Sequence, residues 1–182
     1  TVLLTVLLGS QIPRIQIDTD PENMLPDDQT DRVFHNQVEE TFRLHDALVV
    51  GLVNTSHPEG VYNVQSMTAL HRLTDEILQL DGVIRPDLMS LAVADNITQG
   101  EQGQLRFEWM MKQPPETAEQ AEALRQHVED LPMLRDTLVS GGGKAAAIYV
   151  PIESKDLSYP LSREIRALAA EYAPDQEVYI TG

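Results

Sequence analysis

The sequence predicts an α+β fold with a split βαβ order of strands and helices from residue 46 to the end of the chain. Short runs of valine, leucine, isoleucine and alanine have the length of strands, and the stretches between them repeat apolar residues at helical spacing. The chain has 182 residues, of which 42% are hydrophobic, and is long enough for one domain with a core of its own.

The first residues form an apolar run, 1–8, which is shorter than the about 20 apolar residues needed to cross a bilayer. The run begins without Met and lacks the basic residues that open a signal peptide. Two interpretations remain: a buried strand or helix of the domain, or the outer end of a transmembrane helix. We therefore separate residues 1–13 from a single predicted domain at 14–182.

An additional strand and helix are expected before the split βαβ order begins. Ile15 and Ile17 alternate with polar residues, which predicts a short strand. Residues 18–28 are rich in proline and aspartate and predict a loop. Thr30 or Asp31 can cap the helix that follows. Its apolar positions are Phe34, Val38 and Phe42.

Four strands and two helices make up the split βαβ order itself. The predicted strands are 47–53, 88–93, 145–150 and 178–180. Asn63 is the expected N-cap of the first helix, which ends near Gly82. Pro160 lies near the first turn of the second helix, where proline is tolerated. The apolar positions are Val64, Met67, Leu70, Leu73 and Ile77 in the first helix, and Leu161, Ile165, Leu168, Ala169 and Tyr172 in the second.

A helical insertion at about 96–143 is expected between the two halves. Pro114 and Pro115 are expected to start a helix, and a short helix at 134–138 follows and leads to a run of glycines. The apolar positions of the longer helix are Ala121, Leu124, Val128 and Leu131. Residues 107–111 fit a strand, a helical turn or a mobile flap.

These elements together predict a ferredoxin-like arrangement of the β-α-β-β-α-β type, with the additional strand and helix at its start and the insertion in its middle. Both crossover helices are expected to pack on one face of the sheet. The other face would then be free for a partner or a neighbouring domain.

The charge and the residue types exclude several classes of function. A net charge of −16 repels phosphate groups, so we expect no nucleic-acid partner. The chain has no cysteine, which excludes thiol catalysis, disulfides and cysteine-ligated zinc. We find no pattern for a cofactor, a metal ion or a catalytic set, and we expect no enzyme.

Two motifs resemble ligand-binding loops but are better explained as a turn and a solvent-exposed loop. Gly141–Lys144 lacks the further glycine and the hydroxyl residue of a phosphate-binding loop, because Leu138 and Ala145 stand there, so a hairpin turn is expected. The acidic loop at 18–31 lacks the glycine and glutamate of a calcium-binding EF-hand, because Asn23 and Gln29 stand there.

The insertion contains the best candidate for substrate contact. Aromatic and methionine side chains give an adaptable apolar surface for lipophilic ligands. The candidate residues are Phe107, Trp109, Met110 and Met111. The alternative is ordinary packing of the insertion on the sheet.

Three segments resemble a known transporter family. The loop Asp18-Thr19-Asp20-Pro21-Glu22-Asn23-Met24-Leu25-Pro26 resembles the segment after the first transmembrane helix of resistance-nodulation-division (RND) exporters. Leu138 to Ile148 resembles the family's Leu-x-Ser-x-Asp-Gly-Lys hairpin, with Gly142 where the family often has aspartate. Residues 178–182 resemble the strand before the chain returns to the membrane. The similarity covers almost the whole chain and is greatest to the hopanoid and mycobacterial large-membrane-protein (MMPL) group.

This resemblance implies the extracytoplasmic porter-type domain of an exporter in the cytoplasmic membrane of a prokaryote. It implies proton-driven transport of lipophilic cargo, a small molecule or a lipid. The partners would be the parent's transmembrane domain and its second porter domain, and the parent can be a homo-oligomer. The alternative is a free-standing ferredoxin-like module that binds a ligand or a protein.

Overall fold

The computed structural model describes residues 25–26, 28–42, 44–99 and 104–182, and for 97–99 and 105–107 it describes the backbone alone. The chain divides into two units, Thr1–Leu44 and His45–Gly182, which are treated separately below. The predicted strand at Ile15 and Ile17 and most of the acidic loop lie outside the described residues, as does the run at 1–13.

Helix α2, Thr30–Phe42, is the main described element of the first unit and was predicted from sequence. None of its residues is buried, and Phe34 and Phe42 are 66% and 70% exposed. The Arg32 guanidinium donates a hydrogen bond of 2.6 Å to the carbonyl of Leu25, which ties the helix to the residues before it.

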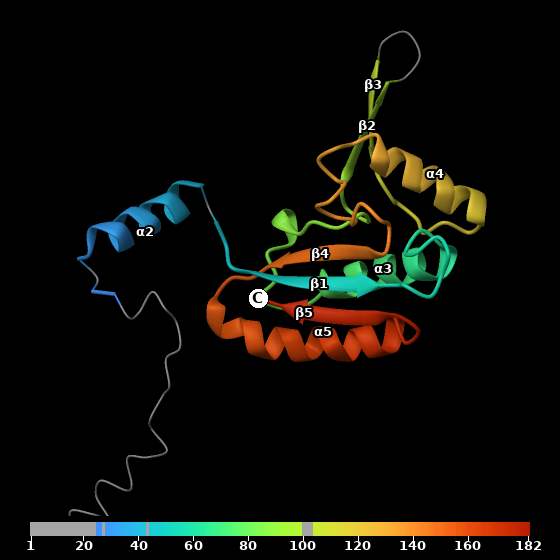
Figure 1. Cartoon of the computed structure of the whole chain (residues 1–182). Coiled ribbons are helices and arrows are strands. Elements are labelled where there is room, and N and C mark those ends of the chain that lie inside the picture. Colours follow the sequence, from blue (N-terminus) through green and yellow to red (C-terminus); the bar gives the residue numbers. More distant parts are fainter. Residues whose placement is uncertain (1–24, 27, 43, 100–103) are drawn as a thin grey trace, which may run out of the picture. The chain divides into compact units, whose positions relative to one another are not determined.

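The second unit is a mixed α+β domain around a three-stranded antiparallel sheet (Figure 1). Strands β1 (Ala47–Val53), β4 (Ala145–Pro151) and β5 (Glu177–Thr181) lie in the order β4-β1-β5. Val50 pairs with Ile148 on one side and Ile180 on the other. All three strands were predicted within one residue of these bounds.

The predicted strand at 88–93 is wrong. Only Met89 forms an isolated bridge, to Tyr149 of β4. The Ser90 carbonyl accepts hydrogen bonds from the N–H groups of Val93 and Ala94, so the chain turns away directly after Met89. A second bridge joins Val83 and Ile152. The residues between Val83 and Met89 include a short 3-10 helix, Arg85–Asp87.

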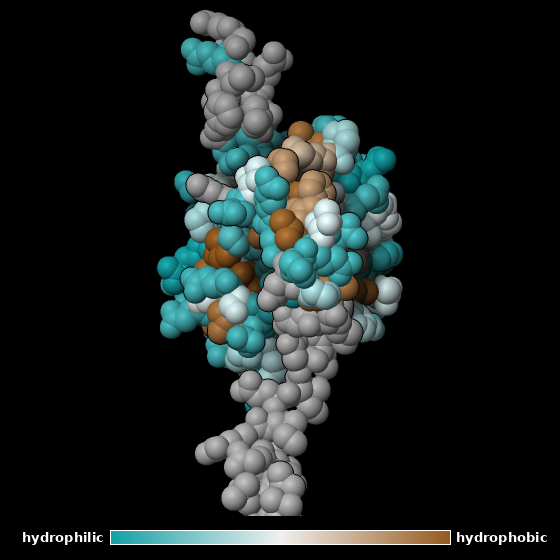
Figure 2. Space-filling model, turned by 90° about the vertical axis from the view of Figure 1, so that its left-hand side faces the viewer, coloured by the Kyte–Doolittle hydropathy of each residue, from teal (hydrophilic) through white to brown (hydrophobic). Residues whose placement is uncertain are grey.

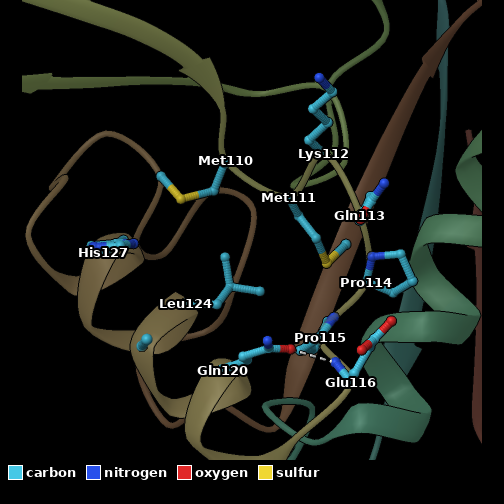
Figure 3. A pocket seen from close by; sticks show the side chains of 11 residues that line it. Met110, Met111, Lys112, Gln113, Pro114, Pro115, Glu116, Gln120, Leu124 and His127 are labelled. Atoms are coloured by element: carbon cyan, nitrogen blue, oxygen red, sulfur yellow. Dashed lines mark hydrogen bonds between the residues drawn. The ribbon is translucent and has the colours of Figure 1, made fainter.

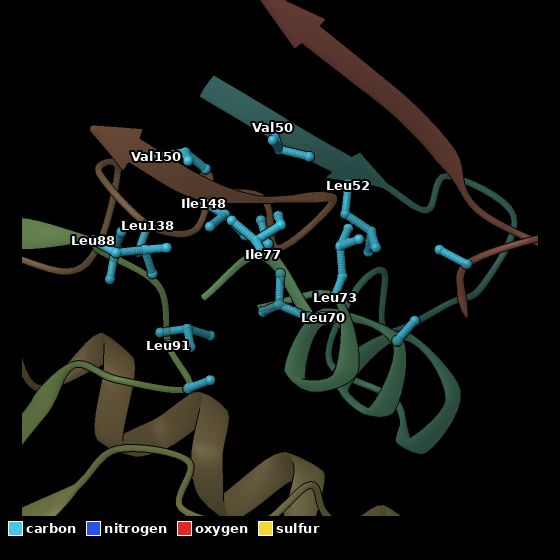
Figure 4. Close-up of a cluster of buried hydrophobic side chains, with 14 of the residues drawn as sticks. Val50, Leu52, Leu70, Leu73, Ile77, Leu88, Leu91, Leu138, Ile148 and Val150 are labelled. Carbon is cyan, nitrogen blue, oxygen red and sulfur yellow. The ribbon is translucent and has the colours of Figure 1, made fainter. Parts of the chain in front are cut away.

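Helices α3 (Val64–Ile77) and α5 (Ser158–Tyr172) share one hydrophobic core with the sheet. Asn63 caps α3 as predicted, and its side chain accepts a hydrogen bond from the Ser66 N–H. The helix ends four residues earlier than expected from Asp81 and Gly82. Figure 4 shows the side chains of α3 and those of β1 and β4 meeting in this core, whose labelled members include Leu70, Leu73, Ile77, Val50 and Ile148.

Burial alternates along β1: Leu48, Val50 and Leu52 are buried, whereas Ala47, Val49, Gly51 and Val53 are half-buried. The buried set contacts the core that α3 and α5 share. Strand β1 is therefore half-buried on its second side, although its sequence is apolar throughout.

The insertion contains the expected helix and also a β-hairpin, so describing it as helical was incomplete. Of the three interpretations of residues 107–111, the strand is correct for residues 107–109. Strands β2 (Asp95–Gln99) and β3 (Leu105–Trp109) form the hairpin, and α4 (Ala118–Glu129) follows. Thr117 caps α4, so Pro114 and Pro115 precede the helix and do not start it.

The short helix expected at 134–138 is also wrong, because these residues form turns. Asp136 has a left-handed φ of 65°, which interrupts a right-handed helix, and isolated bridges join Val139 to Arg135 and Ala146. Leu131 lies beyond the end of α4 and is half-buried.

Among the described residues, no helix is both long enough and apolar enough to cross a membrane. On the side of the molecule shown in Figure 2, hydrophobic residues reach the surface in small groups between hydrophilic ones.

Candidate functional site

The structure separates the four residues proposed for substrate contact. Met110 and Met111 directly follow β3 and are buried, at 6% and 3% exposure. The Met110 N–H donates a 2.7 Å hydrogen bond to the carbonyl of Ala94, which holds the chain against the base of the hairpin as it turns inward. Trp109 stays half exposed, and the side chain of Phe107 lies outside what the structure describes.

The two methionines line a cavity of about 380 Å³, which we call the methionine pocket. It lies between residues 110–116 and α4. Its lining includes apolar and polar side chains from both elements: Met110, Met111, Pro115, Leu124, Lys112 and His127. Figure 3 shows Leu124 rising from α4 between the two methionine side chains.

Hydrogen bonds fix both walls of this pocket. The Thr117 hydroxyl accepts from the Gln120 N–H at 3.3 Å, and the Gln120 side chain accepts from the Glu116 N–H at 2.7 Å (Figure 3). These reciprocal bonds satisfy free N–H groups at the start of α4. On the other wall, the His71 ring lies 3.2 Å from the Lys112 carbonyl and 3.0 Å from the Asp75 carboxylate.

The chemistry of the methionine pocket suits binding of an apolar molecule. Thioethers are polarisable and adapt to irregular shapes, and ligand cavities of about 300–1,000 Å³ are common. Within the described ranges, no group of three histidine, aspartate or glutamate side chains comes together in a way that could hold a metal ion.

A second cavity, of about 700 Å³, lies along α4 and the residues that lead into α3. Its main polar feature is Arg125 of α4, whose guanidinium lies 3.1 Å from the Glu59 carboxylate and 5.7 Å from the ring centre of Tyr62. Within α4, Arg125 also lies 2.9 Å from Glu129 and 3.9 Å from Glu122. Burial, followed by the charge of Glu129, raises the pKa of Tyr62 to about 12.

Sequence reasoning missed this second cavity. The Glu122–Arg125–Glu129 spacing, at i+3 and i+4, is a visible signal for ion pairs on one helix face. Glu59 and Tyr62 lie more than 60 residues away in the chain, and no local pattern connects them to Arg125.

The glycine-rich segment forms the predicted turn. The Gly143 N–H donates to the Ser140 carbonyl at 2.7 Å, and the Ser140 hydroxyl accepts from the N–H groups of Lys144 and Ala145. The Lys144 ammonium donates to the carbonyls of His57 and Pro58 at 3.0 and 2.8 Å. Lys144 therefore fastens the turn to the residues before α3.

Neither the models of known protein families nor the curated proteins give a match to this sequence.

Proposed function

We propose that the chain is the extracytoplasmic porter-type domain of a proton-driven RND exporter and contributes to the passage or recognition of lipophilic cargo. The single observation that carries the proposal is the order of elements around the central strand β1, together with the positions that the family-like motifs take in that order. The domain would lie outside the cytoplasmic membrane of a prokaryote.

The order of the strands in the sheet supports a ferredoxin-like fold within the α+β class. Along the chain, β1, α3, the bridged residues 83–89, the insertion, β4, α5 and β5 follow one another. The bridges of Val83 and Met89 lie beside β4, so the spatial order is 83–89, β4, β1, β5. A split βαβ fold has this order of four strands, with the first strand paired to the third and the fourth.

Two of the three resembling segments lie on either side of the central strand β1. The glycine-rich hairpin leads directly into β4, and the terminal residues form β5. Both strands pair with β1. In the exporter, β5 would connect the domain's core to the chain that returns to the membrane.

The methionine pocket supports a role in recognising cargo. Met110, Met111 and Leu124 contribute apolar side chains to its lining, together with polar side chains from the same two segments. Such a pocket can accommodate different lipophilic molecules without a fixed pattern of hydrogen bonds.

The sheet offers a surface for the rest of the transporter. Tyr179 and Met89 are 61% and 48% exposed, and Val49 and Tyr149 are half-buried. Val49 pairs with Tyr149, Met89 bridges Tyr149, and Gly51 pairs with Tyr179, so these residues belong to the side of the sheet that alternates with the buried set. We propose that the transmembrane domain or the second porter domain covers it.

The parent gene gives the decisive test. Apolar segments of about 20 residues should flank positions 1 and 182 in the parent protein. A parent without membrane-spanning segments would refute the exporter and favour the free-standing binding module. Deleting residues 1–10 separates the same two proposals, because a membrane-helix end contributes little to the melting temperature of the isolated domain and a packed element contributes several degrees.

Cargo binding can be measured through Trp109, the only tryptophan, which is adjacent to Met110. Titration with a lipophilic panel of hopanoids, fatty acids and drug-like molecules should change its fluorescence. Leu124→Gln places an amide without a hydrogen-bond partner in the pocket and should weaken the response about tenfold. Met133→Gln is the matched control, because Met133 is 82% exposed. An equal response in both variants would refute binding in the methionine pocket.

A further inference from the structure

Helix α4 lies between two cavities, and two of its consecutive residues line different ones. Leu124 faces the methionine pocket, and Arg125 lines the second cavity. The buried residues of α4 are Ala121, Leu124 and Val128. Any movement of α4 that withdraws Leu124 from the methionines therefore also displaces Arg125.

Arg125 makes the polar contacts between α4 and the residues that lead into α3. Its Nη1 atom lies 3.1 Å from a Glu59 oxygen, and its guanidinium carbon lies 5.7 Å from the centre of the Tyr62 ring. We call these two contacts the Arg125 clasp. Tyr62 is 5% exposed, so its ring provides a fixed surface under the guanidinium.

The other side of the clasp is firmly held. The Tyr62 N–H donates to the Glu59 carbonyl at 3.1 Å, and the Val61 N–H donates to the Gly143 carbonyl at 2.8 Å. Lys144 donates to the carbonyls of His57 and Pro58. This side of the clasp is therefore hydrogen-bonded to the turn that leads into β4.

We propose that α4 is a lid over the methionine pocket and that the Arg125 clasp controls how often the lid opens. The Arg125 side chain is 34% exposed and that of Glu59 is 53% exposed. Exposed ion pairs and cation–π contacts are individually weak, so the clasp itself breaks and forms again at low cost. Such a contact regulates access to a cavity, whereas a buried ion pair would lock it. Opening the lid also separates Leu124 from the two methionines, which belong to the same hydrophobic cluster.

The ion pairs of Arg125 provide a matched comparison. Glu59 belongs to the segment before α3, so its pair with Arg125 joins two elements. Glu129 belongs to α4 itself, at 2.9 Å from Arg125, so that pair does not hold the lid to its frame. Removing the Glu59 carboxylate should therefore open the lid, and removing the Glu129 carboxylate should not.

Methionine oxidation reports the opening directly, because peroxide reacts with exposed thioethers. The chain carries its own references: Met133 is 82% exposed, whereas Met67 is 0% exposed and lies in α3. In the full 182-residue chain under dilute hydrogen peroxide, mass spectrometry should find rapid oxidation of Met133 and slow oxidation of Met110, Met111 and Met67.

Arg125→Ala and Glu59→Gln should each raise the oxidation rate of Met110 and Met111 about fivefold. This factor is expected when the loss of an exposed ion pair makes opening of the lid more favourable. The rate of Met67 should not change. Glu129→Gln and Arg163→Ala, a change at an exposed arginine on α5, should behave as the unmodified chain.

Unchanged rates at Met110 and Met111 in both clasp variants would overturn the proposal. An equal increase at Met67 would also overturn it, because Arg125 would then stabilise the whole domain. The inference rests on the proposed function only for what enters the pocket. A parent protein that is no exporter would leave the oxidation result unchanged, so the two proposals fail separately.

Discussion

Replacing Gly60 with alanine tests the contact between the residues before α3 and the glycine-rich hairpin. Gly60 has a φ of 61°, in the left-handed region. A Cβ atom at this position would overlap the carbonyl oxygen of Gly143 and lie 2.8 Å from its carbonyl carbon. Because the obstacle is backbone, no side-chain rotation can relieve the overlap.

The expected cost combines three effects. The left-handed conformation costs an alanine about 1–2 kcal/mol. Moving the Gly143 carbonyl away disrupts its 2.8 Å hydrogen bond from the Val61 N–H, which costs about 1–3 kcal/mol when the carbonyl is left without a partner. The lower entropy of the unfolded alanine chain returns about 0.5–1 kcal/mol. We expect Gly60→Ala to lower the free energy of unfolding by about 3 kcal/mol.

Urea denaturation and thermal melting followed by circular dichroism measure this change. A loss of that size should lower the melting temperature by about 6–12 °C. Gly142→Ala is the matched control, because nothing lies within 4 Å of a Cβ at Gly142. It should change the free energy of unfolding by less than about 0.5 kcal/mol. Equal stability of the two variants would refute the packing of the hairpin on the residues before α3.

Three further predictions follow from the core, the cap of α3 and the buried tyrosine. Ile148→Ala removes a fully buried side chain and should cost about 3 kcal/mol in urea denaturation, and a cost below about 1 kcal/mol would contradict its burial. Asn63→Ala removes the cap and the bond from its amide to the Ser66 hydroxyl at 2.9 Å, so the melting temperature should fall by about 2–8 °C, whereas an unchanged value would exclude the cap. The pKa of Tyr62 is about 12 in the folded chain and 10.0 ordinarily, so the unfolded chain loses this proton first as the pH rises. The contribution of the Tyr62 phenol to the free energy of unfolding should be fully present below pH 10. It should fall by about 2–3 kcal/mol as the pH rises to 12. Tyr62→Phe should lack this portion of the decrease, and an identical pH profile in both chains would show that the phenol is not buried.

The fold was predictable where local pattern and tertiary environment agree. The apolar run at 47–53 forms β1 with the predicted bounds, since no turn residue interrupts it except a glycine that the strand accommodates. Asn63 caps α3 because an amide before an apolar helical repeat satisfies a free N–H group at the helix start. The core positions of α3 followed from the same repeat, and Met67, Leu70, Leu73 and Ile77 are all buried.

The insertion was predicted poorly because its local signals compete. Residues 105–109 alternate apolar and polar side chains, as a strand does, but residues 95–99 contain a single apolar residue. Their pairing as a hairpin depends on contacts between the two strands. Leu134 and Leu138 have helical spacing, but the chain between them turns to bring Val139 beside Ala146. There, bridging to β4 outweighs helix propensity, which is worth only tenths of a kcal/mol per residue.

The sequence by itself determined the α+β class, the bounds of the main strands, the Asn63 cap and the apolar faces of α3, α4 and α5, because each depends on residues close together in the chain. Only the tertiary structure decided that Met110 and Met111 turn inward while Trp109 stays half exposed, and that Arg125 meets Glu59 and Tyr62. The contacts of Arg125 join segments more than 60 residues apart, and chain folding brings them together through burial of the core that the sheet and helices share.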